Sequence, residues 1–495
     1  MASDGPKKNL ALTFSPAAQL RNPARMEATH LLDRNRYPEG ARIHLIAVGG
    51  SVMHSLALAL ARSGCRVSGS DDVIRNPARD RLAAANLLPD AEGWFPDRVD
   101  DRVDAVVVGM HARMDNPELQ RARALGLPIY SYPELVRGLA RNQQRIVVGG
   151  SHGKSTTTAL LMHVLGRLNL PFDYLVGASV PGFSHTLQLG SSAPVMLLEG
   201  DEYPAAAFDN RPKALVYEPH LLVMTGISWD HINVYPTEDS YFQAFAQLLA
   251  HLQKGGVCVY NKEDKQLREL VVRHLVKEQH EALPYSTPPI RIGRNGRMEV
   301  KLDGYRFEVA LIGRHNAANL AAAWQVCQQL AIELPEFAAA AADFTGAGLR
   351  LETWRNDDRW VVLRDFAHAP SKVAATVEAV AEHWRERPIV AVLELHTYSS
   401  LNPEFIGHYR NTLKKARHRI VLVDRAVVGQ KGTGAFTQGQ LQKAFHERQL
   451  EVVTDRDELL QAVKRQAGST GVLLLMSSGG LCQIEQAEWL HVVGR

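Results

Sequence analysis

Short apolar runs alternate with amphipathic stretches along most of this chain, beginning at residue 42. The first unit comprises an apolar run over 42–48, a helical pattern over 52–62 and a second extended run over 66–70. Such alternation predicts parallel strands connected by helices. Because it recurs to the end of the chain, we predict an α/β protein whose sheets are largely parallel.

The same pattern predicts most of the later elements. Strands are expected at 104–108, 128–130, 146–148, 195–198, 221–224, 360–363, 389–393, 420–423 and 472–475. Helices are expected at 116–125, 239–253, 315–330, 371–386, 404–415, 437–447 and 457–467. The region 291–310 is rich in glycine and β-branched residues, which favours antiparallel strands.

A chain of 495 residues is too long for one hydrophobic core. At roughly 100–200 residues per domain, about three domains are expected. We predict an irregular lead-in over 1–40, a Rossmann-like N-terminal domain over 41–142, a central P-loop ATPase domain over 143–346 and a Rossmann-like C-terminal domain over 347–495.

The clearest chemical signal is the loop Gly150-Ser-His-Gly-Lys-Ser-Thr156, between a predicted strand and a predicted helix. Glycines let the backbone approach a phosphate, and a helix N-terminus offers free N–H groups to an anion. Lys154 is expected to reach the β- and γ-phosphates, and the hydroxyl of Ser155 or Thr156 to hold Mg²⁺. By itself the loop leaves kinase, ATPase and ligase chemistry open.

Acidic residues follow two of the predicted central strands. Glu199 and Glu202 come after one, and Asp230 and His231 come after another. Strand carboxyl ends line the ligand crevice of an open α/β sheet. We therefore expect Glu199, at the strand end, to complete a Mg²⁺ shell, and His231 to bind a second metal ion or a phosphate.

Three polar positions lie further along the chain. Asn316 and Asn319 either cap the helix that begins near them or hydrogen-bond an adenine edge, and their spacing alone favours capping. Arg350 opens the third domain, where an arginine facing the P-loop would bind the γ-phosphate. Considered alone, an arginine is more often a surface residue.

The first predicted domain also has a glycine turn, Gly49-Gly50-Ser51, with Asp71 at the end of the next strand. The Gly-x-Gly-x-x-Gly pattern is absent. This turn therefore leaves a dinucleotide, a sugar nucleotide or no ligand open.

Composition limits the partners. The net charge of +3 comes from 56 basic and 53 acidic residues, which gives no strong field for nucleic acid. The four cysteines are scattered, as in a reducing compartment, and no apolar run approaches the ~18–20 residues of a membrane helix. We expect a cytoplasmic protein with small-molecule substrates, no nucleic acid, no membrane insertion, and a monomeric or weakly dimeric state.

From about residue 42 to its end, the chain resembles the Mur ligases, ATP-dependent enzymes that form amide bonds in peptidoglycan synthesis. The matching segments stand in the family's order: Val48-Gly-Gly-Ser-Val-Met53, Gly69-Ser-Asp71, the P-loop, Glu199-Gly-Asp-Glu202, Asp230-His231, Gly313-Arg-His-Asn316 with Asn319, Leu349-Arg350, and Asp365-Phe-Ala-His-Ala-Pro370.

The resemblance implies that ATP and Mg²⁺ activate the lactyl carboxylate of UDP-N-acetylmuramate as an acyl phosphate, which an amine then attacks. It implies these sites: ATP at Gly150, Ser151, His152, Gly153, Lys154, Ser155, Thr156, His315, Asn316, Asn319, Arg350 and Asp365; metal at Ser155, Thr156, Glu199 and His231; UDP-sugar at Gly49, Gly50, Ser51, Met53, Asp71, His111 and Arg113; and a peptide near His396, Ser399, Ser477 and Gly479. Lys154, Glu199, His231 and Arg350 would carry the chemistry.

Two branches of the family differ in the amine substrate. The segment 208–219, the turn Met476-Ser-Ser-Gly-Gly480 and Leu393-Glu-Leu-His396 resemble the branch that recycles the tripeptide L-alanyl-γ-D-glutamyl-meso-diaminopimelate. The alternative branch adds L-alanine. A nucleotide-binding sensor without turnover and a P-loop kinase are the alternatives outside ligase chemistry.

Overall fold

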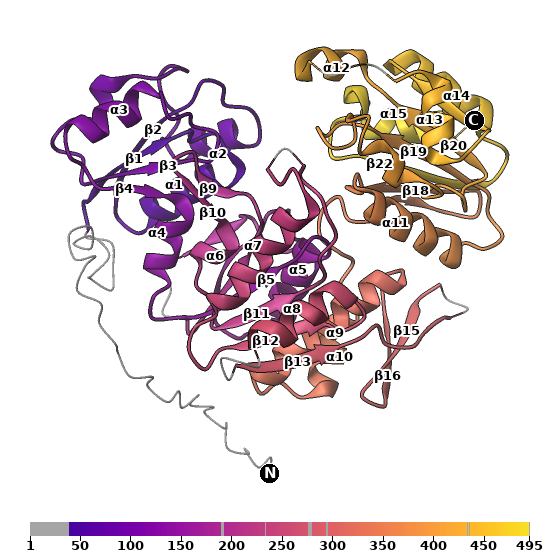
Figure 1. Cartoon of the computed structure of the whole chain (residues 1–495), viewed down its shortest axis with the longest axis horizontal. Helices are drawn as coiled ribbons and strands as arrows, with labels where there is room; N and C mark the ends of the chain where they lie inside the picture. Colours follow the sequence, from indigo (N-terminus) through magenta and orange to yellow (C-terminus); the bar gives the residue numbers. More distant parts are fainter. Residues whose placement is uncertain are drawn as a thin grey trace, which may run out of the picture.

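The computed structural model describes residues 39–189, 193–232, 234–275, 280–293, 296–432, 434 and 436–494. The predicted lead-in over 1–40 lies almost wholly outside these residues. The described chain folds into three lobes in sequence order, each built around its own sheet (Figure 1). The expected α/β architecture with largely parallel sheets is confirmed.

The first lobe has a four-stranded parallel sheet in the order β2-β1-β3-β4. Its strands are β1 (Arg42–Ile46), β2 (Arg66–Ser70), β3 (Ala105–Val108) and β4 (Ile129–Ser131). Its helices are α1 (Ser51–Arg62), α2 (Ala78–Ala84), α3 (Pro117–Ala124) and α4 (Tyr132–Leu139). A capping box between Ser131 and Glu134 fixes the start of α4.

The central lobe has a seven-stranded sheet in the order β13-β12-β11-β5-β8-β6-β7, parallel except for β7. These strands are β5 (Gln144–Gly149), β6 (Phe172–Leu175), β7 (Leu187–Gln188), β8 (Val195–Glu199), β11 (Leu221–Met224), β12 (Val257–Asn261) and β13 (Glu281–Tyr285). The hairpin β9 (Pro204–Ala206) and β10 (Asp209–Pro212) and the antiparallel sheet β14 (Ile290–Ile292), β15 (Met298–Leu302) and β16 (Tyr305–Val309) flank it. The helices are α5 (Lys154–Arg167), α6 (Lys213–Val216), α7 (Glu238–Ala250), α8 (Lys265–Leu275), α9 (Arg314–Gln329) and α10 (Leu334–Ala341).

The third lobe has a six-stranded sheet in the order β17-β18-β22-β19-β20-β21, parallel except for β17. Its strands are β17 (Glu352–Asn356), β18 (Trp360–Asp365), β19 (Ile389–Glu394), β20 (His418–Leu422), β21 (Leu450–Val453) and β22 (Gly471–Met476). Its helices are α11 (Pro370–His383), α12 (Arg425–Lys431), α13 (Gln438–Phe445), α14 (Arg456–Gln466) and α15 (Gln486–Val492).

One predicted helix is wrong. The region 404–415 contains only a 3₁₀ turn, Ile406–Tyr409, followed by turns. Gly407 weakens helical propensity there, and Asn411 has a φ of 60°, which ends any right-handed helix. The apolar residues of this segment are nevertheless buried, as the periodic pattern required: Tyr409 and Leu413 are fully covered.

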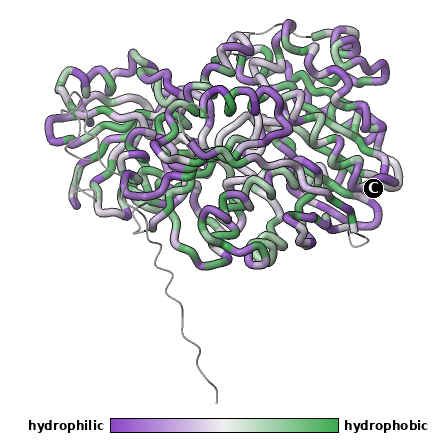
Figure 2. Tube along the Cα trace, turned by 60° about the horizontal axis from the view of Figure 1, so that its bottom comes forward, coloured by the Kyte–Doolittle hydropathy of each residue, from purple (hydrophilic) through white to green (hydrophobic). Residues whose placement is uncertain are grey.

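Hydrophobic residues run through the interiors of the lobes, while hydrophilic residues concentrate on the outer turns (Figure 2). The first and central lobes share one continuous apolar cluster, which extends from Leu45 in β1 to Leu198 in β8. The third lobe has cores of its own. Trp229 of the central lobe packs against Phe405 of the third lobe, with ring centroids 5.7 Å apart. The central lobe thus meets the third lobe through partly buried apolar side chains, Trp229, Ile232 and Ile312, which pack against the third-lobe core.

Candidate active site

The central position of β5 explains why the polar segments converge. Strand β5 pairs with β8 on one side and β11 on the other, all three parallel. Their carboxyl ends consequently lie at one edge, where the P-loop follows β5, Glu199 ends β8 and Asp230 follows β11. The sheet order thus brings together residues that are far apart in the sequence.

The P-loop glycines are required by close packing. Gly150 has a φ of +115°, and a Cβ atom there would lie 2.5 Å from Thr225 Oγ1 and 2.8 Å from the Gly226 carbonyl oxygen. Gly153 has a φ of +81° and forms the N-cap of α5, with the Asn319 side chain occupying the space where a Cβ atom would be. No other residue type fits either backbone position without strain.

Lys154, the first residue of α5, is held in the loop by two partners. Its ammonium group donates to the Gly150 carbonyl oxygen at 2.5 Å and to Glu202 Oε2 at 2.8 Å. Burial alone would lower the pKa of Lys154, but the Glu202 carboxylate outweighs it and raises that pKa. For Glu202, burial is again opposed, because Lys154 and then His231 hold its pKa well below the usual range. The pair is therefore fully charged at neutral pH.

Ser155 and Glu199 form a pair suited to a hard cation. The Ser155 hydroxyl donates to Glu199 Oε1 at 2.7 Å, and Glu199 Oε2 accepts from the Gly177 amide at 2.7 Å. A hydroxyl and a carboxylate at the start of a P-loop helix match the oxygen ligands that Mg²⁺ prefers. Among the described residues there is no cluster of three or more His, Cys, Asp or Glu side chains that could hold a metal by itself.

His231 contacts Glu202 rather than Glu199. Its Nε2 atom is 3.1 Å from Glu202 Oε1, and its Nδ1 atom is 3.0 Å from the Tyr203 hydroxyl. The backbone of His231 has a φ of 59°, in the left-handed region that few non-glycine residues adopt and in which asparagine, aspartate and histidine are enriched. Of the predicted metal ligands, Ser155 and Glu199 therefore contact one another, whereas His231 contacts a different carboxylate, that of Glu202.

The expectation that Asn316 and Asn319 cap a helix is wrong. The N-cap of α9 is Gly313, and no side chain caps it. Asn316 instead donates to the Ile312 carbonyl oxygen at 2.9 Å, and Asn319 donates to Asn316 Oδ1 at 3.1 Å. Both side-chain amides are buried and line the cavity beside the P-loop. Because both residues lie within α9 rather than at its N-cap, they do not bond the free backbone N–H groups at the helix start.

The third lobe contributes Arg350 and Asp365. The Arg350 guanidinium lies 4.5 Å from the centre of the Phe366 ring and 3.5 Å from Ser155 Oγ. Burial lowers the pKa of Arg350, although not enough to discharge a guanidinium. Asp365 accepts hydrogen bonds from the amides of Leu351 and Ala367, each at 2.7 Å, so its carboxylate also fixes the segment that carries Arg350.

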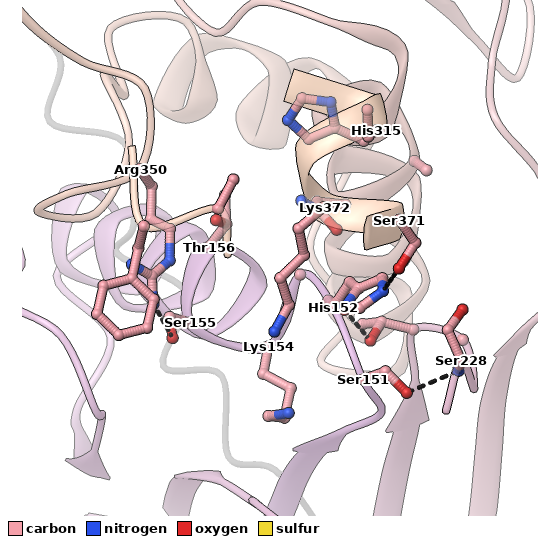
Figure 3. Close-up of a pocket in the computed structure, with 18 of the residues that line it drawn as sticks. Ser151, His152, Lys154, Ser155, Thr156, Ser228, His315, Arg350, Ser371 and Lys372 are labelled. Atoms are coloured by element: carbon pink, nitrogen blue, oxygen red, sulfur yellow. Dashed lines mark hydrogen bonds between the residues drawn. The ribbon is translucent and has the colours of Figure 1, made fainter. Parts of the chain in front are cut away.

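These groups line one cavity of about 490 Å³ between the central and third lobes (Figure 3). Every predicted ATP and metal residue except Gly150 lines it: Ser151, His152, Gly153, Lys154, Ser155, Thr156, Glu199, His231, His315, Asn316, Asn319, Arg350 and Asp365. The cavity also contains Lys372 and His368, to which the sequence reasoning gave no role. Lys372 is the third residue of α11 and lies two residues beyond the family-like segment Asp365-Phe-Ala-His-Ala-Pro370, so no sequence motif included it.

The predicted UDP-sugar residues lie in the first lobe, away from this cavity. The Gly49 amide donates to Asp71 Oδ2 at 2.7 Å, so the glycine turn and the acidic residue do meet. Burial, then the neighbouring Asp72, raises the pKa of Asp71 to about 6. Met53 is buried. Arg113 is exposed and pairs with Asp115 at 3.1 Å.

A second cavity, of about 690 Å³, lies where the three lobes meet. His111 of the first lobe, Asn210 of the β9–β10 hairpin, and His396, Ser399 and Lys431 of the third lobe line it. It shares Tyr203, His231, Phe366 and His368 with the first cavity, so the two cavities adjoin at these residues.

Two of the residues expected near a peptide do not line this cavity. Ser477 is fully buried and its hydroxyl bonds to Glu394, whereas the neighbouring Ser478 lines the cavity instead. Gly479 packs against the His396 ring, where a Cβ atom would overlap it. Adjacent residues at a strand end point to opposite faces, which explains why Ser478, and not the expected Ser477, lines the cavity.

A P-loop and paired acidic residues at the edge of one α/β lobe, closed by an arginine of another, define a nucleotide-dependent enzyme that works between its lobes. Comparisons with known proteins identify the family. The Mur ligase middle domain matches residues 148–327, the Mur ligase family catalytic domain matches residues 42–144, and the Mur ligase glutamate ligase domain matches residues 349–479.

The chain is 32% identical over 388 residues to the UDP-N-acetylmuramate–L-alanine ligase of Paenarthrobacter aurescens, covering 77% of this chain and 82% of that protein. It is 28% identical over 480 residues to the corresponding ligase of Acidithiobacillus ferrooxidans, covering 92% and 98%. A solved murein peptide ligase from Psychrobacter arcticus is similar in fold, with a TM-score of 0.65 at 20% identity over 92% of this chain and 99% of that one. The UDP-N-acetylmuramate–alanine ligase of Thermotoga maritima gives 0.67 at 20% identity, over 92% and 98%.

The chain belongs to the Mur ligase family, whose members are ATP-dependent ligases that form amide bonds. None of the helices in the described ranges has the length and apolar content that crossing a bilayer requires.

Proposed function

We propose that this protein joins the lactyl carboxylate of UDP-N-acetylmuramate to the amine of L-alanyl-γ-D-glutamyl-meso-diaminopimelate, a reaction of peptidoglycan recycling. ATP binds in the 490 Å³ cavity, and the carboxylate is first converted to an acyl phosphate. Ser155 and Glu199 would hold Mg²⁺, which neutralises phosphate charge when bound. UDP-N-acetylmuramate binds along the first lobe near the Gly49–Asp71 turn.

The chemistry divides into two displacements. A lactyl carboxylate oxygen forms a bond to the γ-phosphorus while the bond to the β,γ-bridging oxygen breaks and ADP leaves. The neutral peptide amine then forms a C–N bond to the acyl carbon, the C–O bond breaks, and the proton that the amine loses leaves with inorganic phosphate. Lys154 binds the transferring phosphoryl group, and Arg350 neutralises the charge that develops on it.

The observation that carries the choice of a peptide is the second cavity. Its volume of about 690 Å³ lies in the range of roughly 300–1,000 Å³ that accommodates large ligands, whereas L-alanine has only a methyl side chain. It adjoins the ATP cavity at His231 and His368, which line both cavities and stand where an acyl phosphate would form. A tripeptide extending from that junction fills space that a single amino acid leaves empty.

The chemistry of the cavity wall also suits this peptide, which carries several carboxylates. Lys431, in the last turn of α12, lies 4.1 Å from the centre of the Tyr398 ring. His396 stands beside them. These groups from the third lobe offer one fixed cation and a hydrogen-bonding ring to a carboxylate.

The β9–β10 hairpin, part of the segment that pointed to this branch, gives further support. Arg211 pairs with Asp209 at 2.6 Å and with Glu134 of the first lobe at 2.8 Å, which fixes the hairpin between two lobes. Asn210 of the same hairpin lines the second cavity. The hairpin thus supplies part of the wall of the same cavity that Lys431 lines.

L-Alanine remains the second candidate, because curated relatives 28–32% identical to this chain are L-alanine ligases. The deciding experiment supplies ATP, Mg²⁺ and UDP-N-acetylmuramate with either L-alanine or the tripeptide. We expect a higher kcat/KM with the tripeptide, measured as phosphate release, and an amide-linked product by mass. A higher kcat/KM with L-alanine would contradict the proposal, a phosphorylated product would indicate a kinase, and nucleotide binding without turnover a sensor.

A matched pair of variants tests the cavity itself. Lys431→Gln is expected to raise the KM for the tripeptide about tenfold, because a hydrogen bond to a charged group contributes roughly 1.5 kcal/mol. Lys443→Gln, on the exposed face of α13, removes the same charge outside the cavity and serves as the control. Equal effects of the two substitutions would count against Lys431 as a peptide contact.

A further inference from the structure

Two lysines face one another across the ATP cavity. Lys154 belongs to the P-loop of the central lobe, and Lys372 belongs to the first turn of α11 in the third lobe. In Figure 3 the Lys372 side chain descends from α11 toward Lys154. Each is paired with a carboxylate of the central lobe, Lys154 with Glu202 at 2.8 Å and Lys372 with Asp230 at 3.5 Å.

The two pairs differ in how well the protein neutralises the cation. Lys154 has a short bond to Glu202 and a second bond to a backbone carbonyl oxygen. The separation between Lys372 and Asp230 is well beyond the roughly 2.7–2.9 Å of a strong charge-assisted hydrogen bond. Asp230 is also engaged elsewhere, because its Oδ1 atom accepts from the His231 amide at 2.7 Å.

Three effects act against a positive charge at this position. The Lys372 side chain is only 22% exposed, and this burial is the main reason that its pKa is lowered. Lys154 and Arg350 add like charges in the same cavity. A cation in the first turn of a helix also opposes the helix dipole. The exchange of this lysine for a neutral side chain would relieve all three.

An anion between the two lobes would offset these costs. Lys372 lines the same cavity as Lys154, Ser155 and Arg350. A phosphoryl group is the anion that a P-loop brings to this place. Its oxygens can accept from lysines on both sides at once.

We propose that Lys372 is a catalytic residue of the third lobe that contacts the γ-phosphoryl group of ATP while that group passes to the substrate carboxylate. Asp230 is a positioning residue that holds the Lys372 ammonium over the P-loop. As the bond to the β,γ-bridging oxygen breaks and the bond to the carboxylate oxygen forms, no proton moves. Lys372 neutralises charge on the non-bridging oxygens. The transfer step, though not the γ-phosphate contact, rests on the acyl-phosphate route proposed above.

The first test needs no acceptor substrate. Binding of ADP and of a non-hydrolysable ATP analogue with Mg²⁺ is measured for the native protein, Lys372→Met, Lys372→Arg and Asp230→Asn. Lys372→Met is expected to weaken binding of the ATP analogue about tenfold while leaving ADP binding within twofold, because only the analogue has a γ-phosphate. Lys372→Arg, which keeps the charge, is expected to restore most of the difference.

A lysine that merely joins the two lobes predicts another result. Loss of the ion pair would then matter, so Lys372→Met and Asp230→Asn would weaken both nucleotides alike. That outcome, or unchanged binding of the ATP analogue in Lys372→Met, overturns the proposal.

The second test measures transfer. Hydroxylamine traps an acyl phosphate formed from ATP and UDP-N-acetylmuramate without peptide, and the hydroxamate is counted. Lys372→Met is expected to form it about 100-fold more slowly than the native protein, in line with the loss of one preorganised charge contact, and Asp230→Asn less than tenfold more slowly. If the native protein forms no hydroxamate, the proposed acceptor is wrong, and the nucleotide comparison still decides the role of Lys372.

Discussion

Two glycine turns of this protein follow the same local plan but have opposite chemistry. In the first lobe β1 leads through Gly49 and Gly50 into α1, and in the central lobe β5 leads through Gly149 and Gly150 into α5. The first turn has a carboxylate, Asp71, bonded to its Gly49 amide. The second has a lysine, a hydroxyl and two carboxylates arranged around it.

The difference shows that a glycine turn before a helix is a scaffold and that the surrounding charges decide its ligand. An ionised Asp71 repels phosphate but accepts hydrogen bonds from hydroxyl and N–H groups, which suits a sugar or a base. Lys154 and Ser155 attract phosphate and metal. The second turn is also the more constrained, because Gly150 needs a positive φ whereas Gly50 has a φ of −60°.

The largest expected effect comes from Lys154→Met, which removes the positive charge that distinguishes the Gly149–Gly150 turn from the Gly49–Gly50 turn. We expect ATP-dependent amide formation, measured as phosphate release, to fall by about 10³ or more, since a phosphoryl-binding cation is lost. Stability should also fall by roughly 3–5 kcal/mol, because the buried Glu202 carboxylate loses the cation that lies 2.8 Å from it.

The double variant Lys154→Met with Glu202→Gln separates these effects. We expect it to recover the free energy of unfolding while remaining inactive. Activity that returns with stability would show that Lys154 acts through the fold and not on phosphate.

A smaller effect is expected when alanine replaces the second glycine of either turn, Gly50 or Gly150. Gly150→Ala places a Cβ atom 2.5 Å from Thr225 Oγ1 at a positive φ, so we expect a loss of about 2–4 kcal/mol and weaker ATP binding. Gly50→Ala meets nothing closer than 3.5 Å at an ordinary φ and should change stability by no more than about 1 kcal/mol. Urea unfolding of the two variants measures the difference, and equal losses would mean that the two backbones are not distinguished by strain.

The sequence predicted the central site better than the rest because parallel sheet topology does the assembly. Glu199 and His231 follow strands whose carboxyl ends must meet the P-loop, so their convergence needed only the order of strands. Lys372 was not assigned because its position depends on how the third lobe packs on the central one, which no local pattern encodes.

Local errors have local causes. Asn316 was expected to cap α9, but the N-cap is Gly313, three residues earlier, so Asn316 lies within the helix. Ser477 was expected to face a ligand, but the alternation at the end of β22 directs it to Glu394 and leaves Ser478 in the cavity. In both cases a shift of one to three residues changed the face on which the side chain lies.

The smallest effect concerns the carboxylate of each turn, and the two should depend on pH with opposite sign. The pKa of Asp71 is raised from 3.8 to about 6, so below pH 3.8 both folded and unfolded states are protonated. As pH rises from about 4 to 6 the unfolded chain loses this proton first, and the stability that protonated Asp71 contributes is lost. The free energy of unfolding of the native protein should therefore fall by on the order of 1–2 kcal/mol relative to Asp71→Asn over this range, from about 1.4 kcal/mol per pKa unit reduced by solvent screening.

Glu202 has a lowered pKa, so its contribution to stability is present above pH 4.5 and is lost as pH falls below it. Urea unfolding at pH 4, 5, 6 and 7 of the native protein, Asp71→Asn and Glu202→Gln would measure both trends. If the advantage of the native protein over Asp71→Asn instead grew as pH rose, the Asp71 carboxylate would be stabilised in its charged form, and the contrast between the two turns would fail.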